Sequence, residues 1–90
     1  MKRAIITVVG HDAVGIIAKV CTYLAEHGIN ILDINQTIVN GYFNMMMITD
    51  VSGAEDSFKE LSSGLEKLGE AIGVAIKIQR EEIFDSMHRI

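Results

Sequence analysis

The spacing of apolar residues along the N-terminal part of the chain predicts a strand, a helix and a second strand. Residues 4–9 form a β-branched apolar run short enough to be a buried strand. Residues 13–27 have apolar positions at helical spacing, and Asp12 stands where an N-cap side chain is expected. Gly28 suits the left-handed position that follows many helices. The apolar stripe of this helix consists of Ile17, Val20, Cys21 and Leu24.

The next segment has the pattern of a β-hairpin. Residues 31–39 are strand-like, Asn40-Gly41 is the pair that a type I′ turn favours, and residues 42–51 return as the partner strand. The returning strand is apolar on both faces, which is typical of a strand at the centre of a sheet.

A second helix and a last strand complete the predicted domain. Ser52 and Glu55 have the spacing of a capping box, and Gly69 and Gly73 mark the end of the helix. Residues 74–79 alternate between apolar and polar positions, as a half-buried strand does. The apolar face of the helix consists of Phe58, Leu61, Leu65 and Leu68.

The predicted order β-α-β-β-α-β defines the fold class. With right-handed crossovers it gives an α+β, ferredoxin-like sandwich with one four-stranded antiparallel sheet and both helices on one face. Residues 1–80 are assigned to this domain. Residues 81–90 form an extension in which Ile83, Met87 and Ile90 share a helical face, with Phe84 beside them. An isolated helix this short is marginal in water, so we expect it to dock on the domain or on a dimer partner.

Composition narrows the classes of function. Apolar residues make up 49% of the 90 residues, so we expect some apolar surface to be buried in a homodimer. A net charge of −4 without a basic cluster argues against nucleic acid or an anionic membrane as a partner. The single cysteine excludes a disulfide or multi-thiolate metal site within the chain, and we expect no metal and no cofactor. With no membrane-length apolar run and no recognisable signal peptide, a cytoplasmic location is expected.

The loop before the first helix is the candidate binding site. Unpaired amides and the positive end of the helix dipole meet there, and together they can hold a carboxylate or a phosphate. Gly15 lacks a side chain, which permits close approach of a ligand to the backbone. The loop therefore favours binding of a small anionic or zwitterionic metabolite.

Two short motifs resemble the ACT domain: Asp12-Ala13-Val14-Gly15-Ile16 in the loop, and Gly28-Ile29-Asn30-Ile31 after the helix. The chain is also similar to small stand-alone bacterial ACT proteins and to ACT halves of glycine-cleavage regulators and formyltetrahydrofolate deformylase. The resemblance implies a non-catalytic regulatory module that binds amino acids or related molecules and dimerises side by side. Many ACT loops have proline where this chain has Val14, so the ligand of a relative does not transfer to it.

A complete site requires two copies of the chain. The loop and Asn30 lie at opposite ends of the first helix, about 20 Å apart at ~1.5 Å per residue. Antiparallel pairing of two copies along the edge formed by the second strand brings Asn30 of one copy near the loop of the other. The resemblance implies the same arrangement.

In such a site each group has an expected role. The backbone amides of Ala13, Val14, Gly15 and Ile16 receive the ligand carboxylate, while Asp12 and Asn30 accept hydrogen bonds from its ammonium group and His11 lines the rim. Purely structural roles stay open for these residues. Asp12 can act only as an N-cap, Asn30 only in the turn, Gly15 only in helix–strand packing, and His11 as a solvated loop residue.

Other functions fit the same element order less well. Acylphosphatases need an arginine in the first loop, and residues 10–15 contain none. RNA-recognition domains need aromatic residues and a basic rim, whereas the middle strands here offer only Tyr42 and Phe43. No nucleophile or oriented triad is visible, so we expect no catalytic residue. The open alternative is a protein-interaction adaptor that dimerises without a metabolite and serves a regulated enzyme or regulator.

Overall fold

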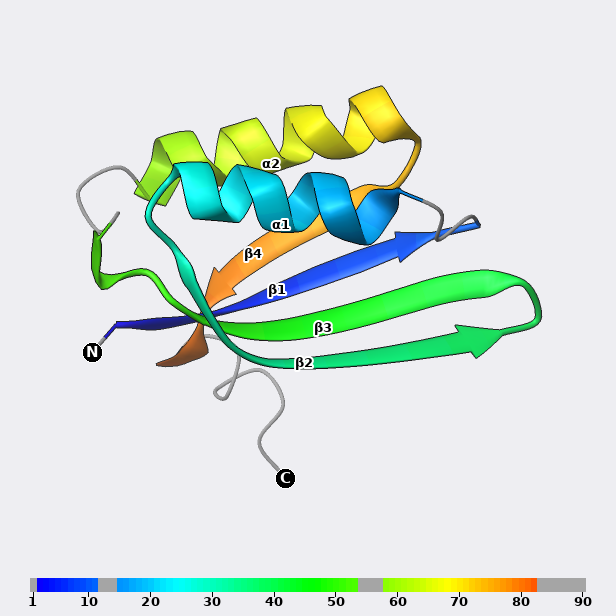
Figure 1. Cartoon of the computed structure of the whole chain (residues 1–90), viewed down its shortest axis with the longest axis horizontal. Coiled ribbons are helices and arrows are strands. Elements are labelled where there is room, and N and C mark those ends of the chain that lie inside the picture. The colour runs from blue at the N-terminus through cyan, green and yellow to red at the C-terminus, as the bar shows by residue number, and fades with distance from the viewer. Residues whose placement is uncertain (1, 12–14, 54–57, 83–90) are drawn as a thin grey trace.

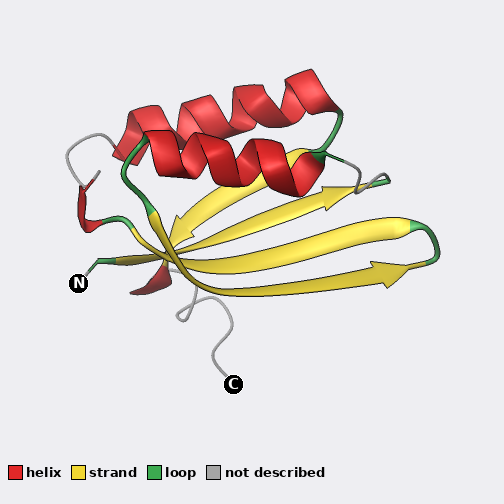
Figure 2. Cartoon of the chain, viewed as in Figure 1, coloured by secondary structure: helices red, strands yellow, loops and turns green. Residues whose placement is uncertain are grey.

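The computed structural model describes residues 2–11, 15–53 and 58–82. Both helices cover one face of the sheet, and the other face, called the open face below, carries neither of them (Figure 1, Figure 2). The predicted ferredoxin-like α+β sandwich is therefore confirmed. Neither described helix is long and apolar enough to cross a membrane. The elements are β1 (Arg3–Gly10), α1 (Ile16–Glu26), β2 (Asn30–Val39), β3 (Tyr42–Asp50), α2 (Phe58–Ile72) and β4 (Ala75–Arg80).

The strands pair antiparallel in the order β2-β3-β1-β4. The strand β3 has a neighbour on each side, as its two apolar faces predicted, and β2 forms an edge of the sheet. In the turn between them, Asn40 and Gly41 have φ values of 50° and 81°, the positive values that a type I′ turn requires. The predicted hairpin is confirmed.

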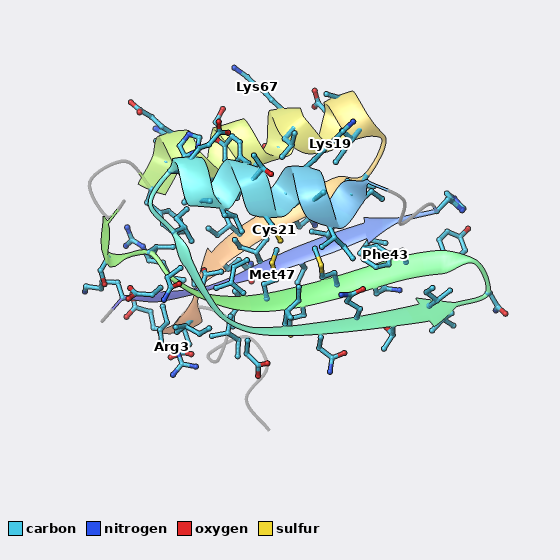
Figure 3. The ribbon with its side chains drawn as sticks, in the orientation of Figure 1. Arg3, Lys19, Cys21, Phe43, Met47 and Lys67 are labelled. Atoms are coloured by element: carbon cyan, nitrogen blue, oxygen red, sulfur yellow. The ribbon has the colours of Figure 1, made fainter. Side chains whose placement is uncertain are left out.

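The hydrophobic core lies between the sheet and the two helices. Phe43 and Met47 point from β3 toward the helices (Figure 3). Thr49 is buried beside them, and its hydroxyl donates a hydrogen bond to the Ala4 carbonyl oxygen at 3.0 Å, so burial leaves this hydroxyl paired. The other core side chains are Ala4, Ile6, Val8, Ile16, Val20, Leu24, Ile29, Met45, Val51, Leu61, Leu65, Ile76 and Ile78.

The start of α1 corrects one prediction from the sequence. Gly15, with φ of 78°, is the N-cap residue, and α1 begins at Ile16 rather than at residue 13. Because a left-handed residue interrupts a right-handed helix, Asp12 cannot be the N-cap of this helix. The C-terminus agrees with the prediction: Gly28 follows the helix, and the Ile29 N–H donates to the Leu24 carbonyl at 2.9 Å.

The boundaries of α2 also differ from the glycine pattern. Gly69 lies inside the helix, which continues to Ile72. The hydroxyl of Ser52 is engaged elsewhere, since it donates to the Asp50 carboxylate at 2.6 Å and accepts from the Lys2 backbone N–H at 3.0 Å. Glu55, the other half of the predicted capping box, lies outside the described residues.

Only the first residues of the C-terminal extension are described. Glu81 and Glu82 are helical, and residues 83–90 lie outside the described part of the chain. The helix predicted over residues 81–90 therefore stays a prediction.

Candidate ligand-binding site

The N-terminus of α1 provides free backbone donors. The Lys19 N–H donates to the Gly15 carbonyl at 3.1 Å, which is the first hydrogen bond of the helix. The preceding amides of the first turn have no intrahelical acceptor, no side chain caps them, and the first turn contains no acidic residue. An ideal Cβ on Gly15 meets nothing within 4 Å, so helix–strand packing does not explain this glycine. The space beside the helix end is free for a ligand.

The predicted loop residues are placed only in part. Asp12, Ala13 and Val14 lie outside the described residues, so their roles stay predictions. The Ile16 side chain is buried in the core, which leaves only its backbone N–H for a ligand. The His11 side chain is exposed at the end of β1.

His11 lies beside an aromatic residue that the sequence did not single out for this site. Its ring contacts the ring of Tyr42, with 4.3 Å between the centroids and 41° between the planes. Tyr42 begins β3 and is 47% exposed, so both rings are accessible from solvent. Together they form a polar and aromatic corner at the hairpin end of the sheet.

Asn30 begins β2 at the other end of the molecule, beside a carboxylate. Asn30 pairs directly with Asp50 of β3, and directly paired side chains share one face of a sheet. The hydroxyl and then the backbone N–H of Ser52 donate to Asp50 Oδ1, at 2.6 and 3.0 Å, and these bonds hold the pKa of Asp50 below its ordinary value. An amide and an ionised carboxylate therefore stand side by side, a combination that suits an ammonium group.

A β-bulge creates this pairing, which explains why the sequence did not reveal it. The register shifts between Ile31 and Asp33, so that Leu32 is an extra residue in β2. Without the bulge, Asn30 would oppose Val51, which is buried. The bulge keeps the amide away from the core and turns it toward the open face.

One chain does not bring the two ends of the site together. The N-terminus of α1 and Asn30 lie at opposite ends of the helix (Figure 1). The helix has 11 residues, so its axis spans roughly 16 Å at 1.5 Å per residue. A single small ligand cannot reach both ends, as the sequence predicted.

The β2 strand presents an apolar free edge. Its side chains are exposed except for that of Ile31, which is half-buried. Asp33 Oδ1 accepts a hydrogen bond from the Ile34 N–H at 2.9 Å. Four large apolar side chains of the strand are exposed, by 42%, 38%, 71% and 59%: Leu32, Ile34, Ile38 and Val39.

Known proteins agree with this architecture. A UPF0237 protein of Bifidobacterium longum is 62% identical over 90 residues, which cover all of both chains. An ACT domain protein from Streptococcus pneumoniae superposes with a TM-score of 0.84 at 43% identity, covering 93% of this chain and 94% of that one.

More distant structures share the fold. A formyltetrahydrofolate deformylase from Pseudomonas syringae has a TM-score of 0.78 at 22% identity, over 89% of this chain and 28% of that one. A protein described as a glycine cleavage system transcriptional repressor has a TM-score of 0.73 at 24% identity, over 88% of this chain and 45% of that one. The family model for the ACT domain matches residues 2–79, so the chain belongs to the ACT-domain family.

Proposed function

We propose that this protein is a non-catalytic regulatory module that binds an amino acid or a related small metabolite between two copies of the chain. The exposed apolar edge of β2 is the observation that carries the proposal. ACT domains as a family are ligand-binding regulatory modules, and the family match supports that general role.

Pairing along β2 solves a problem that the single chain leaves open. An edge strand with exposed apolar side chains and unpaired backbone groups is a template for another strand. Two copies related by a two-fold axis would join their β2 strands antiparallel and form one continuous eight-stranded sheet from two four-stranded ones. The pairing buries Ile38 and Val39, which have little cover in one chain.

The same pairing completes the ligand site. If the two ten-residue strands overlap fully, residue 30 of each copy lies opposite residue 39 of the other. Val39 pairs with Tyr42, whose ring contacts His11, so Asn30 of the second copy stands two strand spacings from Tyr42. That is about 10 Å at ~4.8 Å per spacing, which leaves room for an amino acid between them.

Each side of this gap offers one half of zwitterion recognition. Asn30 and Asp50 of one copy accept hydrogen bonds from the ammonium group. The free amides at the start of α1 in the other copy receive the carboxylate, and His11 and Tyr42 line the rim. Because Asn30 faces the open side and α1 covers the other side, the ligand lies at the β2 edge itself.

The strength of these contacts suits a sensor. Hydrogen bonds to charged groups contribute roughly 1.5–3 kcal/mol each. A few such bonds, less the cost of ordering the ligand and the loop, give a dissociation constant of about micromolar to millimolar. Such a site fills and empties as a metabolite concentration changes.

The experiment measures assembly and binding together. Analytical ultracentrifugation gives the dimer dissociation constant, and a thermal-shift screen of amino acids followed by calorimetry identifies a ligand. Because the site spans two chains, a bound ligand must tighten the dimer, by the reciprocity of linked equilibria. A stable monomer at micromolar concentration would contradict the proposal. A dimer that binds none of these compounds would favour the adaptor function instead.

A further inference from the structure

The open face of the sheet is covered at one end and exposed at the other. On β1, Ile5 is 6% exposed although its side chain lies on the open face and outside the core cluster, whereas Val9 on the same face is 43% exposed. On β3, Ile48 is half-buried and Met46 is 42% exposed. Ile48 and Gln79 are the direct strand partners of Ile5. The covered row therefore crosses three strands at the end where β4 finishes.

The chain leaves β4 at the covered end. The guanidinium group of Arg80 stacks over the Phe58 ring at 4.8 Å, on the helix side of the sheet. The next residue, Glu81, forms an ion pair with Arg3 at 3.0 Å, and Arg3 points away from the helices (Figure 3). Residues 81 and 82 lie on that same side (Figure 1). The described chain thus ends on the open face, two residues along β1 from Ile5.

The remaining eight residues have the composition and length to form the cover. At helical spacing, Ile83, Phe84, Met87 and Ile90 gather on one side. Eight helical residues span about 12 Å at 1.5 Å each, close to the ~13 Å between Ile5 and Val9 along a strand. The ACT-domain match ends at residue 79, whereas the Bifidobacterium longum relative aligns through residue 90. The segment after β4 thus belongs to these small proteins and lies beyond the ACT-domain match.

We propose that residues 83–90 dock on the open face of their own chain. Their apolar side chains cover the patch formed by Ile5, Ile48 and Met46. The segment starts at this patch and is held there by the Arg3–Glu81 ion pair, so its effective concentration over its own sheet far exceeds that over another copy. The docked segment leaves uncovered the hairpin end, where a hollow of about 380 Å³ is lined by Val9, Asn35, Thr37 and Asn44 among others.

Cysteine reactivity in the full-length protein tests the cover. Cys21 is first replaced by serine, so that one introduced thiol is measured alone. Ile5→Cys should react slowly with an aromatic disulfide reagent, and adding Phe84→Asp and Met87→Asp should raise its rate at least tenfold. Val9→Cys is the matched control on the same strand and face, and its rate should not change. If Ile5→Cys does not fold, Ile48→Cys takes its place.

Cross-linking decides which chain provides the cover. In the Cys21→Ser background, Met46→Cys and Met87→Cys should form a disulfide that migrates as a monomer on a non-reducing gel. A covalent dimer would assign the segment to the second copy and overturn docking on the same chain. Ile5→Cys reactivity that ignores the substitutions at Phe84 and Met87 would overturn the cover itself. Neither result depends on whether a metabolite binds at the β2 edge.

Discussion

Gly69 shows how one absent side chain sets the packing of α2 on β4. An ideal Cβ there lies 2.6 Å from the Val74 carbonyl oxygen and 3.1 Å from Ile76 Cγ1. We expect Gly69→Ala to destabilise the protein, because overpacking costs about 1–3 kcal/mol and outweighs the roughly 1 kcal/mol by which alanine favours a helix. Urea unfolding monitored by circular dichroism measures the difference.

Gly64 in the same helix provides the control. A Cβ at Gly64 meets the hydroxyl of Tyr23, the tip of a side chain that can rotate, rather than the backbone. Gly64→Ala should therefore cost less than Gly69→Ala, and combining it with Tyr23→Phe should recover part of the loss. Equal stability of Gly69→Ala and the unaltered protein would show that β4 can shift away from α2.

Asp50 gives the protein a pH-dependent contribution. Its pKa is lowered chiefly by the hydrogen bond from the Ser52 hydroxyl, so the folded state favours the charged form. The resulting stability is present above the ordinary carboxyl pKa and is lost as pH falls through the lowered pKa. We expect Asp50→Asn to lower Tm at pH 7, with a difference that vanishes in acid. A Tm difference that is constant from pH 7 to pH 2 would contradict this account.

Single residues also show what the sequence could reveal about the site. Gly28 and the Asn40-Gly41 pair were predictable because helix ends and tight turns require positive φ. Asp50 and Tyr42 were not predictable as site residues, because the position of Asp50 beside Asn30 depends on the bulge at Leu32. A bulge needs no special residue type there, so the register follows only from the assembled sheet.

At the scale of elements, β2 links the fold to the proposed function. Ile38 is 71% exposed, so Ile38→Lys should change the stability of the single chain by no more than about 0.5 kcal/mol. In a β2-paired dimer the same change buries a charge, and we expect the dimer dissociation constant to rise at least tenfold, or about 1.4 kcal/mol. Sedimentation velocity over a dilution series measures this change.

The control for this edge lies on the same sheet. Val9→Lys adds the same charge at a 43% exposed position on the central strand β1, away from the β2 edge. It should leave dimerisation unchanged. If both variants weaken the dimer equally, the interface lies on the open face and not along β2.

Element boundaries were harder to predict than element order. Apolar periodicity defined all the strands and both helices, because burial on one face enforces the period. The start of α1 was misjudged because Asp12 looked like an N-cap, while Gly15 imposes a left-handed residue three positions later. Backbone conformation at a glycine is permitted rather than dictated by its sequence, so this helix start was not determined by local pattern.

At the scale of the whole molecule, the proposal makes a prediction about mixed dimers. Gly15→Leu blocks the helix end and Asn30→Ala removes the amide, so each homodimer should lose ligand binding at both sites. A mixed dimer has one site in which both residues are intact. A 1:1 mixture should therefore regain about one quarter of the original sites, because half of the dimers are mixed and each of these has one working site of two.

Calorimetry of the mixture with the identified ligand gives the stoichiometry. Gly73→Leu serves as the control for strain, because Gly73 also has a positive φ and an ideal Cβ there meets nothing within 4 Å. It should destabilise the chain about as much as Gly15→Leu, by ~1–2 kcal/mol, and leave affinity unchanged. No recovery of sites on mixing would place both residues in a site within one chain, or outside any site.

The two outer strands of the sheet differ in a way that limits growth. β2 is apolar at its rim, whereas β4, the opposite rim, exposes the cations Lys77 and Arg80. Once two β2 strands have joined, both remaining rims are β4 strands, and their positive charges repel a third sheet. Asp33 adds a further guard, since its carboxylate already occupies the Ile34 N–H. The protein can thus retain a sticky strand without polymerising into fibres, because the stickiness is used up after one encounter.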